Sequence, residues 1–250
     1  LVRDDGFFGP ATEGWWWDLA KADLDGDGDL DLIAGNLGQN TNLKVSAEEP
    51  AQLYYGDFDQ NGSVDPLLTH YIEGQPYPFV SRDNLFGQLA QMRKKFSDYA
   101  SYSSAQIEDI LSADQLETAA VLTVREGRTS WLENRGAEGW ALHPLPVAAQ
   151  MAPVFDILAT DVNQDGRPDL VLAGNLSDTR PTMGPWDANY GQVFLNRGQG
   201  RLEYLPQHRS GLNLIGDVRA IAPLGGGQTL LFFRNDQPLL AYRRNEAAFN

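Results

Sequence analysis

One nine-residue pattern, D-x-[DN]-x-[DN]-G-x-x-D, restricts the fold of this chain more than any other feature, because it occurs three times. The copies are Asp23-Leu-Asp-Gly-Asp-Gly-Asp-Leu-Asp31, Asp57-Phe-Asp-Gln-Asn-Gly-Ser-Val-Asp65 and Asp161-Val-Asn-Gln-Asp-Gly-Arg-Pro-Asp169. Short oxygen-bearing side chains at positions 1, 3, 5 and 9 of a tight turn can converge on one hard cation, and the glycine at position 6 permits the turn. Six or seven oxygens at adaptable distances suit Ca²⁺ better than Mg²⁺ or Zn²⁺.

The pattern therefore predicts three Ca²⁺ sites, in which position 7 contributes only its backbone carbonyl. A single Asp- and Gly-rich copy could be an ordinary surface turn, but three copies with the same ligand spacing argue against that interpretation. The candidate ligands are Asp23, Asp25, Asp27, Asp29 and Asp31 in the first loop, Asp57, Asp59, Asn61, Ser63 and Asp65 in the second, and Asp161, Asn163, Asp165, Arg167 and Asp169 in the third.

An EF-hand is the nearest alternative for such a loop, and two observations exclude it. An EF-hand requires a bidentate Glu at position 12 and a helix on each side. Position 12 is Ala34, Leu68 or Leu172 here, and the residues after each loop, such as Leu170-Val-Leu-Ala-Gly-Asn175, resemble a strand. We therefore expect the loops to connect strands of β-hairpins.

A strand, this loop, a second strand and then Ala-Gly-Asn together resemble the FG-GAP/VCBS repeats of integrin α-subunit β-propellers. A closer resemblance is to secreted bacterial VCBS proteins related to cartilage acidic protein. That second resemblance is carried by Gly14-Trp-Trp-Trp17, Ala34-Gly-Asn-Leu-Gly38, Glu48-Glu-Pro50, Tyr77-Pro-Phe-Val-Ser-Arg-Asp83 and Asp187-Ala-Asn-Tyr-Gly191. The resemblance implies an all-β fold, a β-propeller, in which Ca²⁺ stabilises the blades.

Charge and composition favour an extracellular or cell-surface protein and argue against a nucleic-acid partner. The chain has 34 Asp and Glu against 19 Lys and Arg, a net charge of −15, and it would repel phosphates. It has no Cys, so calcium could provide the stabilisation that disulfides provide elsewhere. Its longest apolar runs are the length of a strand, so we expect no transmembrane segment, and the sequence from Leu1 carries no recognisable export signal. Millimolar external calcium also suits loops of this kind.

The sequence predicts one domain over residues 1–250, with a helical insertion at 81–117. Leu85, Leu89, Met92 and Phe96 have helical spacing after a candidate N-cap at Ser81, and capping boxes start at Ser103 and Ser112. Strands that begin near residues 16, 52, 119, 154 and 217 predict five blades, or four if the strand from 119 completes the second blade. In either case the ring could close through a strand at 1–10, or the chain could be part of a larger propeller.

Other strand pairs follow from local patterns. Residues 119–124 and 130–133 read as strands around a Glu126-Gly-Arg turn. Trp131-Leu-Glu-Asn-Arg-Gly136 and Phe194-Leu-Asn-Arg-Gly198 each begin an outer hairpin of a blade.

No catalytic constellation stands out, so we expect a protein that is not an enzyme. His70, His143 and His208 lie on separate segments, and the sequence contains no nucleophile or phosphate-binding motif in a suitable context. The leading hypothesis is a non-catalytic binding or scaffold module for a protein or glycan partner. One alternative is a carbohydrate-active propeller, a lectin or a polysaccharide lyase, with aromatic residues near Trp186 and Tyr190. Another is an outer-membrane-associated protein that takes part in outer-membrane assemblies, with the helices of 81–117 as its docking face.

Overall fold

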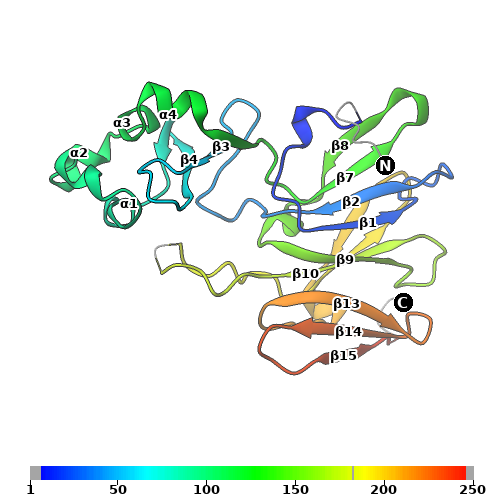
Figure 1. Ribbon diagram of the computed structural model, residues 1–250. Helices are drawn as coiled ribbons and strands as arrows, with labels where there is room; N and C mark the ends of the chain where they lie inside the picture. The colour runs from blue at the N-terminus through cyan, green and yellow to red at the C-terminus, as the bar shows by residue number, and fades with distance from the viewer. Residues whose placement is uncertain (1–6, 182, 246–250) are drawn as a thin grey trace. The chain divides into compact units, whose positions relative to one another are not determined.

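Four antiparallel β-sheets and a few short helices make up the computed structural model, which describes residues 7–181 and 183–245. The described residues form two units (Figure 1). Unit 1 contains residues 7–8, 15–42 and 127–245, and unit 2 contains residues 9–14 and 43–126. The all-β fold class is confirmed at this level, while the single propeller domain stays a prediction.

Unit 1 contains three sheets, each built as a meander. Their strands are, in spatial order, β1 (Asp18–Ala22), β2 (Asp31–Gly35), β7 (Ser130–Asn134) and β8 (Trp140–Pro144); β9 (Val154–Thr160), β10 (Asp169–Gly174), β11 (Gln192–Asn196) and β12 (Leu202–Leu205); and β13 (Val218–Leu224), β14 (Thr229–Arg234) and β15 (Leu240–Arg243). The first strands of the three sheets are neighbours, because β9 contacts both β1 and β13 (Figure 1). The two outer hairpins expected after Trp131 and Phe194 are confirmed as β7–β8 and β11–β12.

Unit 2 interrupts the first sheet between β2 and β7. Its own sheet has the order β5 (Gln75–Pro78), β4 (Asp65–Ile72), β3 (Ala51–Gly56) and β6 (Ala120–Val124). The expected hairpin around Glu126-Gly-Arg is wrong, because β6 pairs with β3 whereas β7 pairs with β2. The alternative in which the strand from 119 completes the second sheet agrees with the structure.

The strand β10 of the sheet β9–β12 is covered on both faces. All six residues of β10 are buried, which is typical of a strand with two buried faces. Leu170 and Leu172 pack with residues of the first sheet, such as Ile33 and Trp131. The alternate residues Val171 and Ala173 pack with Val218, Ile221 and Phe232 of the last sheet. Alternation along one strand therefore joins the three sheets of unit 1.

The helical segment packs on one face of the unit 2 sheet. It comprises α1 (Arg82–Gln88), the 3₁₀ helix η2 (Ala90–Lys94), α2 (Tyr99–Ser103), α3 (Ile107–Ile110) and α4 (Ala113–Thr118). The helical spacing predicts Leu85, Leu89 and Phe96 to face the core, and they are buried with Leu67 of β4 and Phe58 of the second loop. The insertion therefore supplies most of the buried residues in the hydrophobic core of its own unit.

Two of the three expected N-caps are correct. Ser81 accepts a hydrogen bond from the Asn84 N–H, and Ser112 forms a capping box with Gln115. The box expected at Ser103 is wrong, because Asp98 caps α2 and Gln106 caps α3. Ser103 instead ends α2 and its hydroxyl donates to the Ala100 carbonyl, a local bond that competes with capping.

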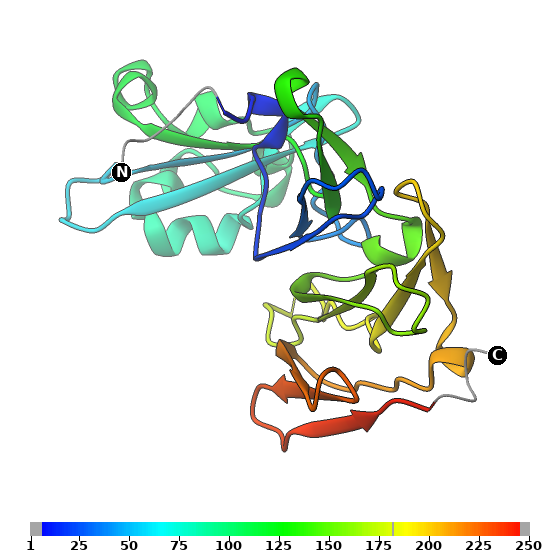
Figure 2. The same ribbon diagram turned by 90° about the vertical axis from the view of Figure 1, so that its right-hand side faces the viewer.

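The remaining described helices are short: η1 (Pro10–Thr12), η3 (Gly136–Glu138), η4 (Val147–Gln150) and α5 (Gln207–Ser210). Figure 2 shows β11 and β12 leading into α5. No helix among the described residues has the length and hydrophobicity needed to cross a bilayer. The strand expected at 1–10 lies mostly outside the described residues, and residue 10 begins η1.

Two aspartates join the inner strands of neighbouring sheets in unit 1. The Asp18 carboxylate on β1 accepts the Ile157 N–H of β9 at 2.8 Å, and the Asp156 carboxylate on β9 accepts the Ile221 N–H of β13. Burial and, after it, the nearby Asp18 carboxylate raise the pKa of Asp156 to about 6. The folded chain therefore binds a proton at Asp156 more tightly than the unfolded chain does.

The substitution Asp156→Asn is expected to stabilise the protein at pH 8. Asparagine resembles the protonated carboxyl, whose stabilising contribution in the native protein is lost as the pH rises from about 4 to about 6. Because Asp156 is only half-buried, we expect a gain of roughly 1 kcal/mol, which disappears near pH 4. Urea unfolding across this pH range measures it, with the exposed Asp178→Asn as the control. Equal stability of the Asp156→Asn variant and the native protein at pH 8 would contradict a raised pKa at Asp156.

Candidate metal centres

The three repeated loops occupy equivalent places in three sheets. Each connects the first two strands of its meander or sheet: β1 to β2, β3 to β4, and β9 to β10. The corresponding connection in the last sheet, between β13 and β14, is Gly225-Gly-Gly-Gln228, which has no carboxylate. The expectation of hairpin loops is therefore confirmed.

The loops also share one internal hydrogen-bond pattern. The carboxylate at position 1 accepts the N–H of the glycine at position 6, at 3.1 Å for Gly28, 2.9 Å for Gly62 and 2.9 Å for Gly166. The side-chain oxygen at position 3 accepts the N–H of position 5, and that of position 5 accepts the N–H of position 7, in every copy. These bonds hold the side chains of positions 1, 3 and 5 within the turn, as a shared binding geometry requires.

Position 4 has a backbone requirement that the sequence pattern does not include. Gly26, Gln60 and Gln164 all have left-handed φ values, of 86°, 60° and 63°. Glycine adopts this conformation without strain, whereas glutamine does not. At this position the first loop therefore forms the shared turn with the least backbone strain.

The aspartate at position 9 is buried in each copy and bonded to the backbone. Asp31, Asp65 and Asp169 have exposed fractions of 1%, 3% and 0%. Each accepts the N–H of position 2, at 2.9 Å, 3.0 Å and 2.9 Å respectively. Asp31 also accepts the Asn134 N–H of β7, and Asp169 the Asn196 N–H of β11. The position therefore links the loop to the third strand of the sheet in both of these copies.

The carboxylates converge differently in the three loops. Ligand atoms of Asp23, Asp25 and Asp27 lie within 4.8 Å of one another in the first loop, and those of Asp57, Asp59 and Asp65 do so in the second. The described residues of the third loop form no such group of three carboxylates, and Asn163 stands at position 3, where the other two loops have an aspartate. Carboxylate oxygens in these arrangements fit a hard cation such as Ca²⁺.

Arg167 changes the electrostatics of the third loop. Its guanidinium pairs with the Asp165 carboxylate and donates to the Asn196 carbonyl. Although burial raises the pKa of Asp165, the bonds from Arg167 and Asn163 outweigh it and lower that pKa. In the first loop, burial and then the surrounding carboxylates raise the pKa of Asp29. The sequence analysis assigned only a backbone carbonyl to position 7. The basic side chain of Arg167 at that position is the signal that could have indicated its pairing with Asp165.

Other residues singled out from the sequence do not gather at one site. His143 contacts Glu133 at 2.7 Å, and His70 packs edge-on against Phe79. Trp186 forms an isolated backbone bridge with Leu176, and the side chain of Tyr190 is 46% exposed.

Comparison with known families gives a match on the first loop and its strands. Residues 15–44 match the FG-GAP repeat. The match includes β1, the loop from Asp23 to Asp31, and β2, and FG-GAP repeats often bind calcium. No curated protein and no solved structure matches the chain. The FG-GAP part of the resemblance is confirmed for this segment, and the relation to VCBS and cartilage acidic proteins stays a prediction.

Proposed function

We propose that the chain is a non-catalytic binding or scaffold module whose β-propeller fold is stabilised by three Ca²⁺ ions. The observation that carries the proposal is the recurrence of one hydrogen-bonded loop at the same strand connection in three sheets. The FG-GAP match at one of these loops supports it.

Calcium would act by neutralising carboxylates that the fold holds together. The ion would be held in the first loop by Asp23, Asp25, Asp27 and Asp31, with the carbonyl of Asp29. The analogous residues would be Asp57, Asp59, Asn61, Ser63 and Asp65 in the second loop, and Asp161, Asn163, Asp165, Arg167 and Asp169 in the third. A bound cation removes the repulsion between adjacent carboxylates and fixes the hairpin on which each sheet depends.

The proposed location is extracellular or at the cell surface. FG-GAP repeats are typical of extracellular proteins, and calcium sites of this class bind at about 10⁻⁴–10⁻³ M, which matches calcium outside cells. The proposed partner is a protein or a glycan, and the net charge of −15 disfavours nucleic acid.

We expect the first loop to bind calcium most tightly and the third most weakly. The first loop has four aspartates at side-chain ligand positions and glycine at position 4, whereas Arg167 already neutralises one carboxylate of the third. Isothermal titration of the native chain, Asp25→Ala and Arg167→Ser tests this order. Asp25→Ala should remove the tightest binding step, and Arg167→Ser should strengthen the weakest step several-fold.

The conservative variant Arg167→Lys serves as the control for Arg167→Ser, because it keeps a cation at that position. If Asp25→Ala lost a weak calcium-binding step and kept the tightest one, the expected order of calcium affinities would be contradicted. Absence of calcium binding to the native chain would contradict the proposed function.

A further inference from the structure

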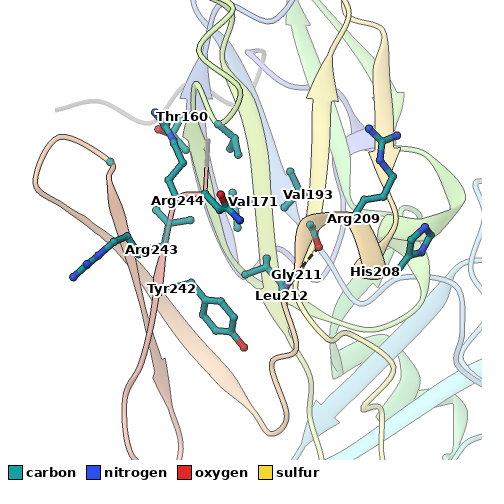
Figure 3. Close-up of a pocket in the computed structure, with 15 residues that line it drawn as sticks. Thr160, Val171, Val193, His208, Arg209, Gly211, Leu212, Tyr242, Arg243 and Arg244 are labelled. Carbon is teal, nitrogen blue, oxygen red and sulfur yellow. Dashed lines mark hydrogen bonds between the residues drawn. The ribbon is translucent and has the colours of Figure 1, made fainter. Parts of the chain in front are cut away.

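A cavity of about 510 Å³ lies in unit 1 between the sheet β9–β12 and the last sheet (Figure 3). The two sheets touch through their inner strands β9 and β13, and the short helix α5 borders the space between their outer parts. Its apolar wall comprises Val162, Val171, Val193, Leu212, Leu230 and Tyr242. Both the volume and the apolar wall are typical of a small-molecule site.

The polar residues of the cavity have the opposite charge to the chain as a whole. The described lining residues include three arginines and one histidine but no Asp or Glu, although the chain contains 34 acidic and 19 basic residues. Figure 3 shows Arg209 and His208 on the side of α5, Arg244 beside Thr160 on the opposite side, and Arg243 pointing away. This excess of basic side chains around the cavity favours an anionic ligand over a cationic or a neutral one.

Arg209 is available to a ligand. Within the described part of the chain its guanidinium forms no hydrogen bond, whereas Arg244 donates to the Asp161 carbonyl. Glu203 on β12 interacts electrostatically with Arg209, but it already pairs with Arg197 at 2.7 Å. A guanidinium beside an apolar wall can bind an anionic group through charge-assisted hydrogen bonds while the body of the ligand packs on that wall.

We propose that this cavity binds a small organic anion, in which a carboxylate, sulfonate or phosphate group is attached to an apolar body. The anionic group contacts Arg209, and the apolar body packs against Val193, Leu212 and Tyr242. The site is separate from the acidic loops in its chemistry, because it selects a negative ligand whereas they select a cation.

Fluorescence titration with two related probes tests the proposal. 8-Anilinonaphthalene-1-sulfonate carries the anionic group, and N-phenyl-1-naphthylamine is its neutral counterpart. We expect the sulfonate to bind the native chain at one saturable site. Arg209→Gln should weaken sulfonate binding about tenfold, and it should change the affinity for the neutral probe less than about twofold. Leu230→Trp, which fills the cavity from a partly buried position on β14, should weaken the binding of both probes.

The control is Arg180→Gln, which makes the same charge change at an exposed position outside the cavity. Urea unfolding of each variant separates loss of binding from loss of folding. Equal sulfonate binding by Arg209→Gln and Arg180→Gln would overturn the assignment of Arg209. Unchanged binding by a folded Leu230→Trp variant, or non-saturable binding to the native chain, would overturn the site itself.

Discussion

Replacement of Asp169 by alanine is expected to lower the free energy of unfolding by roughly 4 kcal/mol, even without calcium. The carboxylate is fully buried and accepts the N–H groups of Val162, Asn163 and Asn196 at 2.9, 3.3 and 2.8 Å. Alanine would leave these donors without an acceptor, and a buried donor without a partner costs about 1–3 kcal/mol. Urea unfolding in excess chelator measures the effect without any contribution from bound metal.

The matched control is Asp165→Ala in the same loop. Asp165 is exposed, so water can replace its hydrogen bonds, and we expect a loss below about 1 kcal/mol in chelator. A similar loss in both variants would show that position 9 is only a metal ligand. A much larger loss at Asp169 would show that it also holds the loop to β11.

The second large effect is expected at Gly174, the glycine of the Ala-Gly-Asn sequence that ends β10. A Cβ atom there would lie 1.8 Å from the Pro153 carbonyl oxygen, and the equivalent glycine, Gly35, would bring its Cβ 2.5 Å from the Val154 carbonyl oxygen. Since both neighbours are backbone atoms, the strand itself must move. Gly174→Ala should therefore destabilise the protein by about 3 kcal/mol or more, as measured by urea unfolding.

The same substitution at Gly87 is expected to have the opposite sign. Gly87 lies within α1, and a Cβ atom there would meet nothing within 4 Å. Alanine favours the helix over glycine by about 0.5–1 kcal/mol, so Gly87→Ala should stabilise unit 2. Destabilisation of similar size by both variants would contradict the role of close backbone approach at Gly174.

The sequence predicts most accurately where local geometry and chemistry agree. Oxygen side chains at fixed spacing, with glycine at position 6, can form only a tight turn between extended segments, and all three copies lie between paired strands. The strand after the third loop and the apolar spacing of Leu85, Leu89 and Phe96 also follow from simple patterns. In each of these cases the residues that form the signal are close together in the chain.

Features that depend on distant pairing are not visible in the sequence. The strands at 120–124 and 130–134 are adjacent in the chain, but β6 pairs with β3 and β7 pairs with β2, a choice made by tertiary packing. The Asp156 bond to Ile221 and the arginines around the cavity beside α5 join residues from different segments. Buried hydrogen bonds to the aspartates at position 9 are likewise absent from a pattern that describes only spacing.

Thermal unfolding in 5 mM Ca²⁺, compared with excess chelator and with 5 mM Mg²⁺, tests the central claim most directly. With dissociation constants of about 10⁻⁴ M, each site would contribute about 2 kcal/mol. Three sites would then contribute about 6 kcal/mol together, so we expect calcium, but not magnesium, to raise the unfolding temperature by roughly 12–24 °C. The same unfolding temperature in calcium and in chelator would contradict the account, because the three acidic loops would then hold their hairpins without a metal ion.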